Sequence, residues 1–413
     1  MSKIKKALKQ LLPGIFLFGF TVGTGSVTAM AKAGADYGMT LLWAVFLSCL
    51  ITFFLLNLFG KFTIITGETA IASIRKHIHP AVAIFFIIGL TANIVGSVIG
   101  IMGIVSDVCF EWSKNMVDGG IAPIYFAGTF VVMIYLIFLQ GNTNLFEQIL
   151  AIIVAIMAVC FLINFVMLAP PIEVLAKGML PNMPDTGDDS SAFLVAASMV
   201  GTTVFSGLFI LRTTLVRETK WTISDLKTQR KDALFSGILI FFVSAAIMAA
   251  AAGTLHVEGI KLENVSEFIT LLEPFAGRIG VAIFVIGLVA AGISSQFPNV
   301  ALLPWLLDDY HQRKTNMRRR EYRLIALGIS LLGLIVPIFN AKPILIMIMS
   351  QAFGALLLPI TVTCILILGN KSSLMKEYTY RLPVNIILSS ILIFSLIMSY
   401  MSVTGIVSIL SSL

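Results

Sequence analysis

Stretches of about 20 apolar residues recur along this chain, and each is long enough for a helix to cross the hydrocarbon core of a bilayer. With 58% hydrophobic and only 12% charged residues among 413, the chain is too apolar for a water-soluble domain. The sequence therefore predicts an all-α, multi-pass membrane protein. We expect eleven transmembrane helices, at 12–36, 39–60, 80–105, 121–140, 145–168, 191–216, 233–254, 277–297, 322–339, 343–368 and 382–410.

The distribution of basic residues predicts how the chain is oriented. If the N-terminus is cytoplasmic, most of the 28 Lys and Arg residues fall in inner segments, with the densest clusters at 212–231 and 313–323. This agrees with the positive-inside rule and leaves the C-terminus outside. The net charge of +7 then reflects topology, so we expect no nucleic-acid partner, and we place the chain in a bacterial inner membrane.

The first and sixth apolar runs are both interrupted near their middle. The first contains the Gly-Thr-Gly-Ser stretch 23–26, and the sixth contains Val-Gly-Thr-Thr-Val-Phe-Ser-Gly at 200–207. Glycine weakens a helix interior, and breaks at matching positions of two halves indicate a midplane site between inverted repeats. We therefore expect a five-plus-five architecture: a first repeat at 1–168, a second at 191–368 and one further helix at 382–413. The alternative is that these glycines only allow close helix packing, as Gly96 and Gly100 do.

Several segments resemble the natural resistance-associated macrophage protein (Nramp) family of transporters. The strongest is the run Ala-Gly-Ala-Asp-Tyr-Gly-Met-Thr-Leu-Leu-Trp at 33–43, followed by 61–67, with weaker similarity at 96–97, 211–216, 350–351 and 358–359. The resemblance implies the LeuT-like fold of the APC superfamily, with helices 1 and 6 broken. It also implies a secondary transporter that works by alternating access and not an enzyme.

The same resemblance exposes missing metal ligands. Where the family has Asp-Pro-Gly-Asn in helix 1, this chain has Gly-Thr-Gly-Ser at 23–26, and Met-Pro-His in helix 6 is replaced by Phe-Ser-Gly at 205–207. Leu90 and Asn93 occupy the places of the acidic pair that handles protons. A dehydrated divalent cation needs anionic ligands, so no metal ligand is assigned.

We therefore expect first a small polar organic solute, a zwitterion or carboxylate, gripped by exposed backbone groups and helix N-termini. The alternative is uptake of a divalent cation, such as Mn or Mg, through a site depleted of ligands. The predicted substrate-binding residues are the same in both cases: Gly23, Thr24, Gly25, Ser26, Asn93, Thr202, Phe205, Ser206, Gly207 and Gln351.

Ser294 and Ser295 lie where this fold can place hydroxyls against helix 1, so we expect them to bind Na⁺ as a coupling ion, unless they serve only helix packing. Lys32 and Arg212 are further candidates, because a charge within a membrane segment is costly. The alternative is that Lys32 extends to the outer surface and that Arg212 anchors the inner end of the sixth span. We expect no other cofactor. The partners are the substrate and the lipid bilayer, and a monomer is the simplest expectation.

Overall fold

The computed structural model describes residues 19, 21–140, 144–167, 170–184, 189–269, 271, 273–313 and 319–412, and within these ranges the regular structure is entirely helical. The first half contains α3 (Thr24–Tyr37), α4 (Leu42–Thr66), α5 (Ala70–His77), α6 (Pro80–Ser113), α7 (Pro123–Gln140), α8 (Asn144–Met167) and α9 (Ile172–Gly178). The second half contains α10 (Asp189–Thr203), α11 (Ser206–Glu218), η1 (Ile223–Asp225), α12 (Leu226–Ala251), η2 (Ala252–His256), α13 (Val265–Ile269), α14 (Glu273–Tyr310), α15 (Arg320–Leu332), α16 (Ile335–Phe339), α17 (Pro343–Asn370), α18 (Ser372–Met375), η4 (Lys376–Tyr378) and α19 (Leu382–Ser412).

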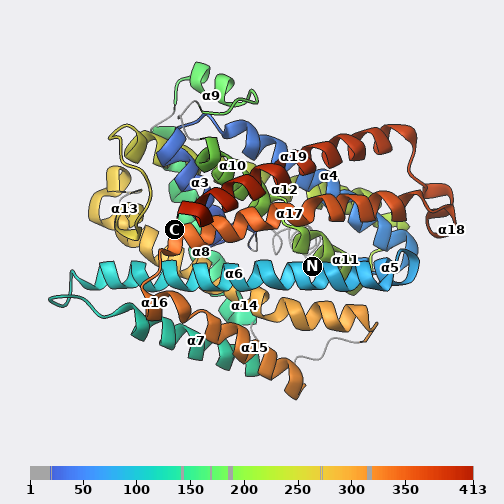
Figure 1. Cartoon of the computed structure of the whole chain (residues 1–413), viewed down its shortest axis with the longest axis horizontal. Coiled ribbons are helices and arrows are strands. Elements are labelled where there is room, and N and C mark those ends of the chain that lie inside the picture. Colours follow the sequence, from blue (N-terminus) through green and yellow to red (C-terminus); the bar gives the residue numbers. More distant parts are fainter. Residues whose placement is uncertain are drawn as a thin grey trace, which may run out of the picture.

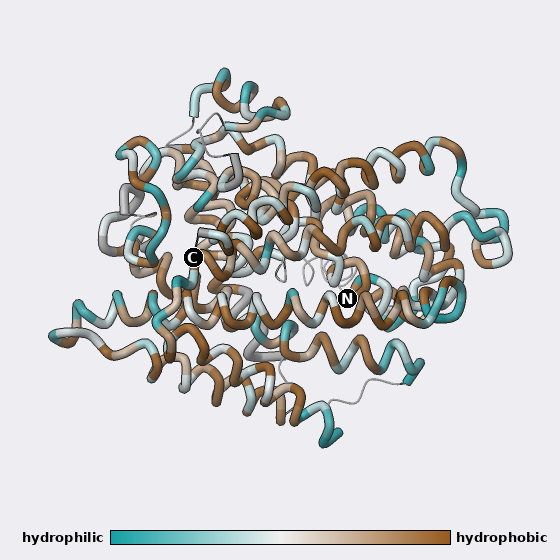
Figure 2. Tube along the Cα trace, viewed as in Figure 1, coloured by the Kyte–Doolittle hydropathy of each residue, from teal (hydrophilic) through white to brown (hydrophobic). Residues whose placement is uncertain are grey.

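The helices form one bundle with polar ends (Figures 1 and 2). In this view the short helix α13 lies at the left, α9 protrudes at the top, and α5 and α18 lie at the right. Hydrophilic residues gather around these short helices and their loops, while the long helices are mainly hydrophobic. This is the pattern of a protein whose middle is surrounded by lipid.

Eight helices or helix pairs in the described residues are long and apolar enough to cross a membrane: α4, α6, α10 with α11, α12 with its flanking turns, α14, α15 with α16, α17 and α19. The predicted spans 121–140 and 145–168 contain shorter apolar helices, Pro123–Leu139 and Ile152–Ile163. Of the predicted first span, residues 12–18 and 20 lie outside the described residues. The chain is thus an all-α, multi-pass integral membrane protein.

Glycines bring the central helices into close contact. A Cβ on Gly201 of α10 would lie 1.9 Å from the backbone oxygen of Gln351 in α17. A Cβ on Gly34 of α3 would lie 2.1 Å from the backbone oxygen of Met248 in α12. The expected packing role of Gly96 is also seen, since its missing Cβ leaves room for Ser350. Small residues therefore set the spacing of the helices that carry the two breaks.

Helix α14 is longer than predicted. The sequence indicated an end near residue 297, but the helix continues through Pro298 and Pro304 to Tyr310. Proline inside a helix removes one hydrogen bond, yet neighbouring helices in a membrane bundle tolerate it. The apolar residues that follow Pro298, including Val300 and Leu302, are fully buried and favour continuation.

Arg212 lies in the core of the bundle and not at its inner surface. Its side chain and that of Asp232 on α12 are both 0% exposed, and Nη1 donates a 2.5 Å hydrogen bond to Asp232 Oδ2. Nη2 donates to the Gln229 backbone oxygen at 3.2 Å, and the guanidinium lies 5.3 Å from the Trp221 ring centroid. Arg212 therefore binds α11 to α12, and it does not line the cavity described below.

Candidate functional site

The first break is a bend before α3. Thr21 is helical, Val22 and Gly23 are bent, and α3 begins at Thr24. Gly23 has an extended conformation (φ −100°, ψ −174°) and provides no side-chain cap. Its carbonyl accepts the first hydrogen bond of α3, from the Val27 N–H at 3.0 Å. The remaining N–H groups of the first turn have no acceptor within the helix, as at any uncapped N-terminus.

The second break separates α10 from α11. The helix ends at Thr203, and Phe205 is extended (φ −66°, ψ 120°) before α11 begins at Ser206, again without a side-chain cap. Thr52 of α4 donates its hydroxyl to the Thr203 carbonyl at 2.8 Å, so a neighbouring helix satisfies a backbone group at the break. Both predicted interruptions are therefore present.

A cavity of about 50 Å³ lies between the two breaks. The lining contains hydroxyls, side-chain amides, glycines and two apolar residues, and it includes no acidic or basic side chain. The described residues also contain no group of three or more His, Cys, Asp or Glu that could hold a metal ion. The lining residues are Thr21, Gly23, Gly25, Ser26, Asn93, Ser97, Ile101, Thr202, Phe205, Ser295, Asn299 and Gln351.

One wall of the cavity, between α6 and α17, is a hydrogen-bonded network. Asn93 Nδ2 donates to the Ser350 backbone oxygen at 2.7 Å, and the Ser97 and Ser350 hydroxyls are 3.1 Å apart. Gln351 Nε2 lies 3.3 Å from both Ser97 Oγ and Met347 Sδ. The amide of Gln351 lies where a side chain on Gly25 would begin, since a Cβ there would be 2.6 Å from Nε2. Glycine in the first break thus makes room for Gln351.

The opposite wall, between α3 and α14, has polar atoms without partners. Ser26 is 1% exposed and Ser295 is 4% exposed, and in the described part of the chain neither hydroxyl has a hydrogen-bond partner. Neither serine bonds back to its own helix, although Thr28 does so through Thr24 O at 2.7 Å. Asn299 lies one turn beyond Ser295 on the same helix and also lines the cavity.

Eight of the twelve predicted site residues line the cavity: Gly23, Gly25, Ser26, Asn93, Thr202, Phe205, Ser295 and Gln351. Thr24 instead directs its hydroxyl toward the Leu288 carbonyl, 3.5 Å away. The Ser206 hydroxyl accepts a 2.7 Å hydrogen bond from the Thr361 hydroxyl of α17. Gly207 packs against the Phe205 ring, since a Cβ added to Gly207 would lie 2.5 Å from ring atoms of Phe205. Ser294 is half-buried outside the lining. These four residues do not line the cavity, and the binding roles of all twelve stay predictions.

Four further residues line the cavity that were not predicted from the sequence: Thr21, Ser97, Ile101 and Asn299. Asn299 could have been predicted from the sequence, because it follows Ser295 by four residues and so lies on the same helix face. It was missed because the predicted span ended at residue 297.

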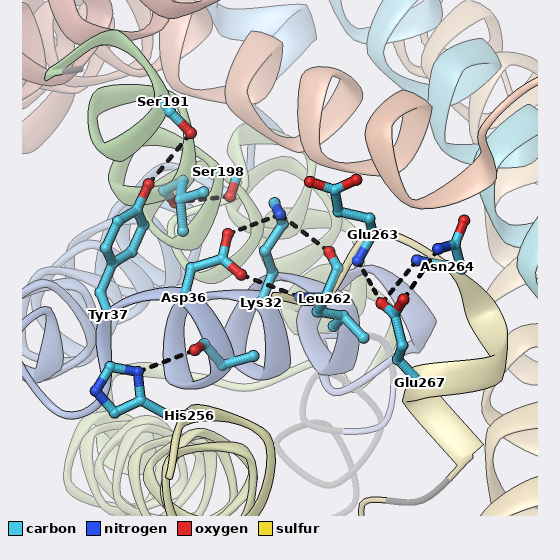
Figure 3. Close-up of polar contacts among 12 residues, drawn as sticks. Lys32, Asp36, Tyr37, Ser191, Ser198, His256, Leu262, Glu263, Asn264 and Glu267 are labelled. Atoms are coloured by element: carbon cyan, nitrogen blue, oxygen red, sulfur yellow. Dashed lines mark hydrogen bonds and ion pairs between the residues drawn. The ribbon is translucent and has the colours of Figure 1, made fainter. Parts of the chain in front are cut away.

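Lys32, the other charged candidate, does not line the cavity and instead forms a latch near the C-terminal end of α3 (Figure 3). Its Nζ lies 2.7 Å from Asp36 Oδ2 and donates to the Leu262 backbone oxygen at 3.0 Å. Asp36 Oδ1 accepts from the Leu262 N–H at 3.1 Å, so the ion pair holds both peptide groups of one buried residue. Since α3 begins at the cavity and ends at this latch, α3 cannot tilt away from the α12–α14 connection without breaking these contacts.

The loop that presents Leu262 is itself ordered by Glu267. Its carboxylate accepts hydrogen bonds from the N–H groups of Glu263 and Asn264 at 2.7 and 3.0 Å (Figure 3). Burial raises the pKa of Glu267, but the hydrogen bonds from the Asn264 backbone and side chain and from the Glu263 N–H outweigh it and hold the pKa below its usual value. Glu267 therefore remains ionised at neutral pH and keeps the loop in place.

A bundle with two half-helices meeting at an internal polar cavity defines the class of inverted-repeat membrane transporters. The family model described as natural resistance-associated macrophage protein-like matches residues 15–405, so the chain belongs to the Nramp family. Members of this family are transporters, which agrees with the predicted function class.

Curated relatives are distant in sequence. The divalent metal cation transporter MntH of Pectobacterium carotovorum is 28% identical over 312 residues, covering 71% of each protein. The natural resistance-associated macrophage protein 2 homolog of Dictyostelium discoideum is 23% identical over 414 residues, covering 95% of this chain and 62% of that protein.

Solved structures share the fold. A mutant of the Eremococcus coleocola manganese transporter has a TM-score of 0.78 at 16% identity, covering 99% of this chain and 88% of that one. A Na⁺-coupled sialic acid symporter has a TM-score of 0.61 at 12% identity, covering 96% and 89%. The predicted LeuT-like fold is therefore confirmed, while the proposed division at 168, 191, 368 and 382 stays a prediction.

Proposed function

We propose that this Nramp-family chain imports a divalent metal cation by alternating access, with the cation bound in the cavity between the two breaks. Membership of the Nramp family and similarity to divalent metal cation and manganese transporters support this cargo. They favour it over the organic solute that the sequence led us to expect first. The predicted orientation, with the N-terminus cytoplasmic, agrees with import but stays a prediction.

The single observation that carries the proposal is a cavity lined by neutral oxygens at the meeting point of both half-helices. Hydroxyls of Ser26, Ser97 and Ser295 and amides of Asn299 and Gln351 offer ligands that hard cations accept. The lining contains no carboxylate or thioether that could offset the free-energy cost of removing all water from the ion. We therefore propose that the cation keeps part of its water shell, as Mg²⁺ commonly does in proteins. The cavity admits water-sized bodies, which suits a partly hydrated ion.

A second cargo class, a small carboxylate or zwitterion, is favoured by the helix ends. The N-cap residues of α3 and α11, Gly23 and Phe205, line the cavity, and neither helix has a side-chain cap. Helix N-termini attract negative charge, and no acidic residue in the lining competes for it. Coupling to Na⁺ also remains a prediction, resting on Ser295 alone because Ser294 lies outside the lining. Uptake that is unchanged when choline replaces Na⁺ would reject it.

Calorimetry and uptake into proteoliposomes separate the two cargo classes. We expect saturable binding of MnCl₂ or MgCl₂ to the purified full chain, and saturable uptake of the same ion, both lost in a Gly25→Val variant that fills the cavity. The matched control is Gly128→Val on α7, where nothing lies within 4 Å of an added Cβ. The second cargo class is favoured if calorimetry detects no heat of metal binding. In that case the wild type should bind an amino acid or a small carboxylate, and Gly25→Val should abolish that binding.

A further inference from the structure

The two walls of the cavity differ in how many of their hydrogen bonds are already made. On the α6–α17 wall, Asn93, Ser97 and Gln351 are hydrogen-bonded to Ser350, to Met347 or to one another. On the α3–α14 wall, the Ser26 and Ser295 hydroxyls have no partner among the described residues. These bonds engage the amide N–H groups of Asn93 and Gln351 and fix how both side chains lie. A ligand that bound the second wall would, in addition, satisfy hydroxyls that burial leaves unsatisfied.

The position of the two serines makes this difference specific to the cavity. Buried hydroxyls without partners also occur at Ser48 on α4 and Ser244 on α12, but these residues do not line the cavity. Ser26 and Ser295 lie on facing helices that approach closely, since a Cβ on Gly292 would be 3.0 Å from Thr24 Oγ1. Asn299 adds a side-chain amide to the same wall.

We propose that Ser26, Ser295 and Asn299 form the primary contact surface for the transported cation, and that Asn93 and Gln351 are positioning residues that shape the opposite wall. This rests on the proposed function and deepens it. The sequence predicted Ser26 as a substrate residue and Ser295 as a residue for the coupling ion. In this proposal both serines belong to one site. Two hydroxyl oxygens and one amide oxygen then replace part of the water shell of the ion.

The inference predicts an unusual signature for two variants. In Ser26→Ala and Ser295→Ala, the thermal unfolding midpoint without ligand should be unchanged or higher, because each removes a buried hydroxyl that has no partner. The same variants should weaken Mn²⁺ binding by about tenfold or more, because each removes a contact to the ion. Ser48→Ala and Ser244→Ala are matched controls, and both should bind Mn²⁺ as the wild type does.

The experiment is a titration of MnCl₂ against each purified full-length variant, followed by thermal unfolding and calorimetry, with L-alanine as a second probe. If both serine variants bind Mn²⁺ like the wild type, the inference is wrong while metal transport stands. If the wild type binds L-alanine and not Mn²⁺, and both serine variants lose that binding, the proposed metal cargo is wrong, but Ser26 and Ser295 still contact the cargo. A wild type that responds to neither probe overturns both.

Discussion

Replacing Asp232 by Ala is expected to destabilise the folded chain by about 3–5 kcal/mol, because it leaves the buried guanidinium of Arg212 without its counter-charge. Both side chains are fully buried, so water cannot solvate the remaining charge. The loss should extend beyond α11 and α12, since Gln229 also donates to the Leu56 backbone oxygen of α4 at 3.0 Å. The midpoint of thermal unfolding in detergent, with the yield of monodisperse protein, measures it.

Two further variants test whether the charge is the cause. Glu218→Ala removes an exposed carboxylate at the end of α11 and should leave the midpoint nearly unchanged. The double variant Arg212→Met with Asp232→Leu removes both charges and should recover much of the stability, as apolar replacements of buried ion pairs often do. A double variant as unstable as Asp232→Ala alone would show that the ion pair is not the origin of the loss.

Adding one methyl group at Gly201 is expected to abolish most cargo uptake. The Cβ of an alanine would lie 1.9 Å from the backbone oxygen of Gln351 and 3.0 Å from the Ala355 N, so α10 and α17 must separate. Backbone cannot move aside as a flexible side chain can, and overpacking of this kind costs about 1–3 kcal/mol or more. Thr202 and Gln351, which line the cavity, lie on the two helices that would be displaced.

Uptake into proteoliposomes, normalised to the amount of folded protein, measures the effect of Gly201→Ala. Gly128→Ala is the control, because nothing lies within 4 Å of an added Cβ there. Near-normal uptake by Gly201→Ala would mean that the contact between α10 and α17 does not fix the geometry of the cavity.

The bundle and its two breaks could be predicted from the sequence because both depend on local chemistry. Long apolar runs must form helices in lipid, since their backbone groups have no other partners. The glycines and hydroxyl residues at 23–26 and 200–207 weaken the helix wherever they lie. The absence of an acidic group from the cavity lining was also visible, because Gly23, Ser26 and Phe205 stand where the family resemblance implies metal-binding side chains.

The contacts between distant segments could not be predicted in the same way. The sequence indicates that Lys32 and Arg212 are costly in a membrane, but not that their partners are Asp36 with the Leu262 backbone and Asp232. It does not reveal that Gly201 touches a carbonyl 150 positions away, nor which serines are left without partners. These features arise from helix packing, which no local pattern encodes.

The location of bound Mn²⁺ decides whether the cavity between the two helix breaks is the cation site. Anomalous X-ray scattering from crystals grown with MnCl₂ should give one strong peak in the cavity, within coordination distance of Ser26 and Ser295 oxygens or of their bridging waters. A competing location exists in a cavity of about 410 Å³ lined by Asp107, Glu111 and Glu263, whose carboxylates attract cations. A peak there, with none between the two helix breaks, would contradict the account.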